Sequence, residues 1–113
     1  MQIYHNARCS KSRNALKLLK SITSHVEVIQ YTKETITVKE IKMLLLKLNI
    51  KPIELIREQE KEWKENYQGK KIHDDEIIKA ITTFPKLMQR PIVVNGNKAI
   101  IGRPVENILK IFN

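Results

Sequence analysis

The segment that most constrains the fold of this chain is residues 91–101, which predicts a β-hairpin. Two stretches rich in β-branched and other apolar residues, 91–94 and 98–101, lie on either side of Asn95-Gly96. Asn-Gly readily forms the tight turn that joins two antiparallel strands. We therefore expect two antiparallel strands that end at Gly102.

The N-terminal part of the chain predicts a β-α-β unit. Residues 2–5 suit a short strand, and residues 25–31 contain enough β-branched residues for a second one. Between them, apolar residues recur at helical spacing after Cys9. These residues are Ala15, Leu16, Leu19 and Ile22. A right-handed crossover through this helix is expected.

The sequence predicts a helical insertion at about residues 37–84. Thr37 and Glu40 have the spacing of a capping box, and Asp74 and Asp75 suit the capped, negatively charged N-terminus of another helix. A last amphipathic helix is expected after Pro104, with apolar residues at helical spacing. These are Val105, Ile108, Leu109 and Phe112.

This order of elements predicts an α/β protein with a thioredoxin-like fold, in which flanking helices cover a mixed four-stranded sheet. A chain of 113 residues is long enough for one core and short for two ordinary domains. We expect a single domain over residues 1–113, with the helical insertion inside it.

The composition limits which binding partners and which cellular compartment we expect for this protein. The chain has 21 Lys and Arg against 12 Asp and Glu, a net charge of +9 that favours acidic partners or small oxyanions. These cations are spread along the whole chain, and one Trp, three Tyr and two Phe offer few stacking surfaces for nucleic acid. No apolar run approaches the roughly 20 residues that span a bilayer. We expect a cytoplasmic protein that binds neither nucleic acid directly nor membrane.

Cys9, the single cysteine, is the strongest candidate for chemistry. It falls between a predicted strand and a predicted helix, where free N–H groups and the positive helix end lower the pKa of a thiol. Arg8 adds positive charge, and Ser10 or Ser12 can donate a hydrogen bond to the sulfur. His5 is either a nearby cation or a partly buried structural residue. Without a Cys-x-x-Cys or paired-His motif, we expect no metal.

Four segments of the sequence resemble, in order and at similar spacing, the signatures of the glutaredoxin-coupled arsenate reductase family. They are residues 3–13 (IYHNARCSKSR), 54–57 (ELIR), 87–94 (LMQRPIVV) and 101–104 (IGRP). The resemblance covers essentially the whole chain. Ala7 stands where the family usually has proline, which removes a constraint on φ before the thiol loop.

This resemblance implies that Cys9 attacks arsenate, or a similar oxyanion, and forms a covalent adduct. It implies three arginines around the oxyanion, whose planar forks suit paired oxygens: Arg57, Arg90 and Arg103. The residues around Cys9 that are expected to support the thiolate are His5, Asn6, Arg8 and Ser12. The Arg90–Pro91 peptide bond is expected to be cis.

The resemblance further implies an external reductant, which the lack of a second cysteine also requires. Glutathione would act as co-substrate and attack the adduct, arsenite would leave, and glutaredoxin would reduce the mixed disulfide. No bound cofactor is expected.

Two other functions stay open. A regulator resembling the Spx proteins would bind RNA polymerase and use its thiol as a redox sensor, although many such regulators carry Cys-x-x-Cys where this chain has Cys9-Ser10-Lys11-Ser12. A monothiol oxidoreductase acting on glutathione mixed disulfides would also need only one cysteine.

Overall fold

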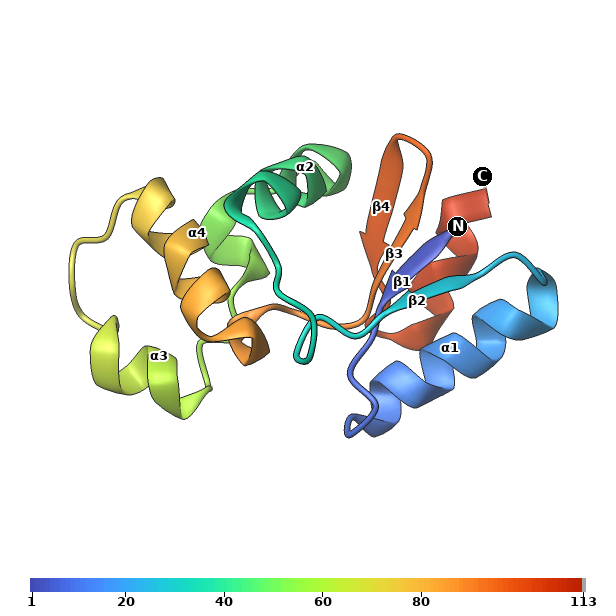
Figure 1. Cartoon of the computed structure of the whole chain (residues 1–113), viewed down its shortest axis with the longest axis horizontal. Helices are drawn as coiled ribbons and strands as arrows, with labels where there is room; N and C mark the ends of the chain where they lie inside the picture. The colour runs from blue at the N-terminus through green and yellow to red at the C-terminus, as the bar shows by residue number, and fades with distance from the viewer. Residues whose placement is uncertain (113) are drawn as a thin grey trace. The chain divides into compact units, whose positions relative to one another are not determined.

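The computed structural model describes residues 1–112, and the chain divides into two compact units (Figure 1). One unit contains Met1–Glu34 and the chain from Arg90 onward, and the other contains Thr35–Gln89. The second unit includes the helical insertion predicted at about residues 37–84. Asn113, the last residue of the predicted domain, lies outside the described residues.

A mixed four-stranded sheet forms the first unit, with the strand order β2-β1-β3-β4 (Figure 1). β1 (Gln2–Tyr4) pairs in parallel with β2 (Glu27–Ile29), and α1 (Ser10–Ile22) connects the two. β1 also pairs antiparallel with β3 (Ile92–Asn95), which pairs antiparallel with β4 (Lys98–Ile101). The predicted β-α-β unit, hairpin and thioredoxin-like sheet are therefore confirmed.

The turn of the hairpin lies one residue further along the chain than predicted. Asn95 still belongs to β3 and pairs with Lys98, so the two-residue loop is Gly96-Asn97 rather than Asn95-Gly96. Gly96 has a φ of 62°, in the left-handed region that favours glycine. A positive φ at only the first loop position matches the type II′ turn, which takes glycine there.

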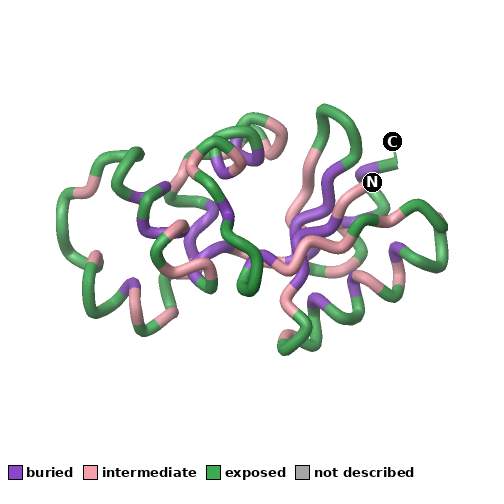
Figure 2. Tube along the Cα trace, viewed as in Figure 1, coloured by how far each residue is buried: buried purple, intermediate pink, exposed green. Residues whose placement is uncertain are grey.

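One face of the sheet carries the core of this unit. Ile3 and Val93 pack there against α1 and against η3 (Val105–Phe112). The residues that these two helices contribute are buried: Ala15, Leu19, Ile108 and Ile111. Figure 2 shows the buried stretches running along the strands and the inward side of α1.

The C-terminal element is a 3₁₀ helix, whereas the sequence predicted an ordinary amphipathic helix. A 3₁₀ helix has three residues per turn, so residues three apart share one face. Val105, Ile108 and Ile111 have this spacing and pack on the core. Leu109 and Phe112, which were expected on the buried face, are exposed.

The second unit is helical. Its elements are α2 (Val38–Leu48), η1 (Pro52–Leu55), α3 (Lys61–Asn66), α4 (Asp74–Thr83) and η2 (Pro85–Leu87). The predicted capping box of α2 is confirmed, since Thr37 Oγ1 accepts a hydrogen bond from the Glu40 amide and the Glu40 carboxylate accepts one from the Thr37 amide. No helix within residues 1–112 is long and apolar enough to cross a bilayer.

The start of α4 differs from the prediction. His73 occupies the N-cap position, and its side chain makes no capping hydrogen bond. Asp74 and Asp75 lie in the first turn instead of capping the helix. Their carboxylates still favour the positive end of the helix, so their contribution is one of charge rather than of capping.

Candidate active site

Cys9 occupies the N-cap position of α1, at the end of the short loop that follows β1. The Cys9 carbonyl accepts the first helical hydrogen bond, from Arg13 N at 3.0 Å, and its own amide donates to the Asn6 carbonyl at 3.0 Å. The chain therefore turns tightly into α1 at the thiol. This is the position between strand and helix that the sequence predicts for Cys9.

A buried serine on α1 holds the loop before Cys9. Ser12 is fully buried, and its Oγ accepts a hydrogen bond from the Asn6 amide at 3.0 Å and lies 2.7 Å from His5 Nδ1. The Asn6 side chain accepts a hydrogen bond from the Arg8 amide at 3.0 Å. These bonds join the end of β1, the loop and the first turn of α1.

Arg13 of α1 also holds the loop, at Ala7. Its Nη1 donates a hydrogen bond to the Ala7 carbonyl at 2.7 Å. Ala7 is the position at which the resemblance leads us to expect proline. The bond from Arg13 restrains this part of the backbone from outside the loop.

The surroundings of Cys9 lower the pKa of its thiol below the ordinary value. Burial alone would raise this pKa, but hydrogen bonding from the Ser12 amide and from the Arg90 side chain lowers it, as do the charge of Arg90 and the Lys11 amide. The net effect favours the thiolate, which is the nucleophilic form. The helix N-terminus and one arginine thus act together on the sulfur.

Arg90 brings the positive charge to Cys9 from a distant part of the sequence. It lies two residues before the start of β3, and its peptide bond to Pro91 is cis. Within the described part of the chain, neither Nε nor Nη1 of Arg90 has a hydrogen-bond partner, although both atoms are buried. Buried polar groups almost always have partners. The N–H groups of these two Arg90 nitrogens are therefore available to an acceptor that is not part of the chain.

The other two predicted arginines occupy different settings. Arg103 follows β4, has a cis bond to Pro104, and lines a groove of ≈ 430 Å³ with Lys11 and other residues of α1 and η3. Arg57 belongs to the helical unit, where its amide donates to the Leu87 carbonyl at 2.7 Å and its guanidinium contacts the Glu60 carboxylate. Their predicted role around an oxyanion stays a prediction.

The structure shows the setting of the predicted supporting residues, and their role beside the thiolate stays a prediction. The Ser12 hydroxyl is engaged by His5 and Asn6, so it is the Ser12 amide that favours the thiolate. His5 is buried, and this burial lowers its pKa, which argues against a cationic role at neutral pH. Arg8 is exposed, and its amide is held by Asn6. The cation that acts on Cys9 is Arg90.

The pairing of Ser12 with His5 was missed, although the sequence carries a signal for it. Ser12, Ala15 and Leu19 have the spacing of one helix face, and all three are buried. A hydroxyl on a buried face needs a partner, and His5 at the end of β1 supplies one.

No group of three or more His, Cys, Asp or Glu within residues 1–112 is placed to hold a metal ion.

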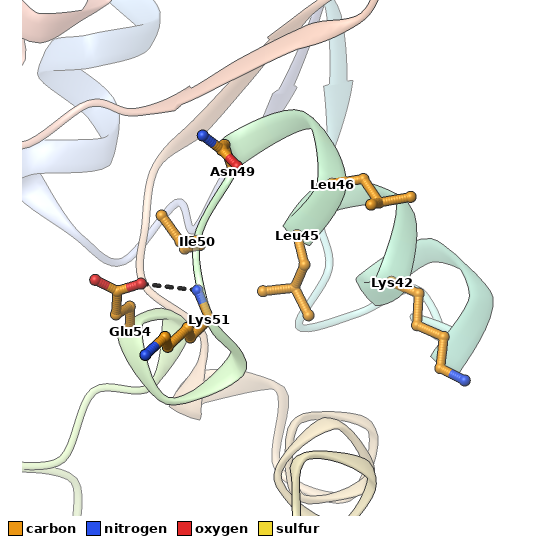
Figure 3. A pocket seen from close by; sticks show the side chains of 7 residues that line it. All are labelled: Lys42, Leu45, Leu46, Asn49, Ile50, Lys51 and Glu54. Atoms are coloured by element: carbon orange, nitrogen blue, oxygen red, sulfur yellow. Dashed lines mark hydrogen bonds between the residues drawn. The ribbon is translucent and has the colours of Figure 1, made fainter.

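A larger hollow, of ≈ 650 Å³, lies in the helical unit (Figure 3). Aliphatic side chains form much of its lining, among them Leu45, Leu46 and Ile50. The Glu54 carboxylate beside it accepts a hydrogen bond from the Lys51 amide at 2.7 Å. Its lining contains none of the predicted site residues among those described. The chemistry indicated by the sequence therefore lies at Cys9.

The fold and the site together define a thioredoxin-like protein with a single activated thiol and an arginine beside it. The ArsC family model matches residues 4–111, so the chain belongs to the ArsC family. The Escherichia coli uncharacterized protein YfgD is 42% identical over 98% of this chain and 95% of its own length. An arsenate reductase of Haemophilus influenzae is 37% identical, over 96% of each chain. The solved structure of an arsenate reductase from Vibrio cholerae matches with a TM-score of 0.92 and 38% identity, over 98% of each chain.

Proposed function

We propose that this protein reduces arsenate to arsenite, with Cys9 as the nucleophile and glutathione and glutaredoxin as the external thiols. The observation that carries the proposal is that two buried nitrogens of Arg90 lack a hydrogen-bond partner in the described chain, beside a thiol whose pKa is lowered. A small oxyanion supplies the oxygen acceptors that these donors need. Arsenate reductases among the relatives support arsenate as that oxyanion.

The first step forms a bond between sulfur and arsenic. The Cys9 thiolate attacks arsenic, and one oxygen of arsenate takes up protons and leaves as water. Both reactants are negatively charged, so they repel each other unless cations offset the charge. Arg90 and the N-terminus of α1 supply positive potential at the place where the two meet.

Reduction requires a second thiol, because the chain has a single cysteine. A glutathione thiolate attacks the Cys9 sulfur, the sulfur–arsenic electron pair passes to arsenic, and arsenic leaves as arsenite, reduced by two electrons. Cys9 and glutathione are left in a mixed disulfide, which has lost the same two electrons. A glutaredoxin thiol then reduces this disulfide and restores the Cys9 thiolate.

The test is arsenate reduction by the purified protein with glutathione and glutaredoxin, with arsenite measured directly. We expect Cys9→Ser to abolish turnover and Arg90→Ala to reduce it about 100-fold, the scale seen when one donor to developing charge is removed. Lys110→Ala, which removes an exposed cation of η3, serves as the matched control and should retain activity.

Two outcomes would contradict the proposal. Failure of the folded, reduced protein to form arsenite would exclude arsenate reduction under these conditions. Turnover of a glutathionylated substrate that is insensitive to Arg90→Ala, at a pH high enough to ionise Cys9 in both proteins, would instead favour the monothiol oxidoreductase, because a disulfide substrate has no oxyanion for the arginine to bind.

A further inference from the structure

A second groove adjoins the thiol loop and runs along part of α1. It has a volume of ≈ 440 Å³, and Ala7 of the loop lies at its lining together with three cations of α1: Arg13, Lys17 and Lys20. His5 and Leu16 complete the lining. The volume falls within the range of about 300–1,000 Å³ that is common for small-molecule sites.

The charge of this groove has one sign. Its lining contains three cations and no carboxylate among the described residues. The sequence of α1 itself contains no Asp or Glu, and its first turn lacks the acidic residues that usually favour a helix N-terminus. The groove is therefore complementary to a ligand with more than one negative charge.

The spacing of the cations suits an elongated ligand that reaches the thiol loop. Arg13 and Lys20 are seven residues apart, which corresponds to about 10.5 Å along a helix axis. Arg13 is held to the Ala7 carbonyl, two residues before Cys9, whereas Lys17 and Lys20 lie further along α1. One end of a bound ligand would thus lie beside the thiol loop, and its carboxylates would lie along the helix.

We infer that this groove binds the carboxylates of the small thiol peptide that resolves the Cys9 adduct, a peptide of the glutathione type. The inference rests on the proposed function, because that function requires an external thiol at Cys9. Lys17 and Lys20 are positioning residues here: they hold the peptide while its sulfur reaches Cys9. Arg90 is not among the described residues that line this groove, so a ligand held there leaves the Arg90 donors free for the oxyanion.

The test uses thiol–disulfide exchange, which needs no arsenate. The Cys9 thiolate attacks one sulfur of oxidised glutathione, the disulfide bond breaks, and a glutathione thiolate leaves with the electron pair. Intact-mass spectrometry follows formation of the mixed disulfide on Cys9. Bis(2-hydroxyethyl) disulfide, which is uncharged, reacts by the same steps and reports the reactivity of the thiolate alone.

The variants are the double substitution Lys17→Gln with Lys20→Gln, and Lys110→Gln as a control with an exposed lysine on η3. We expect the double substitution to lower the rate constant for oxidised glutathione about three- to tenfold, and to change the rate for the uncharged disulfide less than about twofold. Raising the salt concentration to about 0.5 M should remove most of the difference between wild type and the double variant.

The inference is overturned if the double variant retains the wild-type rate ratio between the two disulfides, or if Lys110→Gln lowers that ratio equally. If the ratio is unchanged and glutaredoxin-dependent turnover is lost as well, the inference is overturned and the cations instead bind a protein. A lowered ratio in a protein that forms no arsenite would uphold the groove and reject the proposed function, so the two failures are distinguishable.

Discussion

Replacing Ser12 with alanine tests whether the buried hydroxyl holds the thiol loop. The Ser12 hydroxyl is paired with His5 Nδ1 and accepts from the Asn6 amide, and alanine leaves both groups without this partner. Ser21→Ala is the matched control on the same helix, because the Ser21 hydroxyl is exposed and bonds only to the carbonyl one turn before it, that of Leu18.

The expected size of the effect follows from the burial of the two partners. A buried polar group left without a hydrogen bond costs about 1–3 kcal/mol. His5 is buried and should cost about 1–3 kcal/mol, whereas the partly buried Asn6 amide can regain water and should cost about 1 kcal/mol. We therefore expect Ser12→Ala to lower the free energy of unfolding by about 2–4 kcal/mol, and Ser21→Ala to change it by less than about 0.5 kcal/mol.

Urea unfolding followed by circular dichroism measures both variants. With an m-value of about 2 kcal/mol/M, the midpoint of Ser12→Ala should fall by about 1–2 M, while that of Ser21→Ala should barely move. Equal midpoints for the two variants would refute the reasoning, because the buried network would then contribute no more than an exposed hydroxyl.

Three further predictions concern protonation and packing. Burial lowers the pKa of His5 from 6.5, so the unfolded chain binds the proton more readily than the folded chain. The contribution of His5 to the free energy of unfolding is therefore fully present above pH 6.5 and is lost as the pH falls below it. Urea midpoints measured from pH 8 to 5 should show this loss, and a flat profile would contradict it. The rate of Cys9 alkylation by iodoacetamide should have a pH midpoint below that of an ordinary thiol. Arg90→Ala should move this midpoint upward, because the arginine favours the thiolate. A midpoint that the substitution leaves unmoved would assign the lowered pKa to the helix alone. Leu44→Ala should lower the free energy of unfolding by about 2–5 kcal/mol, because Leu44 is fully buried. Leu46→Ala on the same helix should have little effect, because the Leu46 side chain is 83% exposed. Similar losses of stability in the two variants would contradict the packing of α2.

Local signals predicted much of the fold. The Asn-Gly hairpin, the capping box of Thr37 and Glu40, and the helix after Cys9 are all present, because each depends on residues close together in the chain. The hairpin turn was displaced by one residue, since its register depends on pairing between the two strands.

The local sequence is enough to place Cys9 at the start of a helix that follows a strand, where its thiol meets free backbone N–H groups. Which side chains act on the thiol depends on contacts between distant parts of the chain. Arg8 is next to Cys9 in the chain, yet Arg90 reaches the sulfur, because the antiparallel pairing of β1 with β3 brings the start of β3 to the end of β1. In the same way, the helix turns Ser12 inward to His5, seven residues away, and burial keeps that histidine neutral. Proximity in space, set by strand pairing and burial, governs the charge at the thiol.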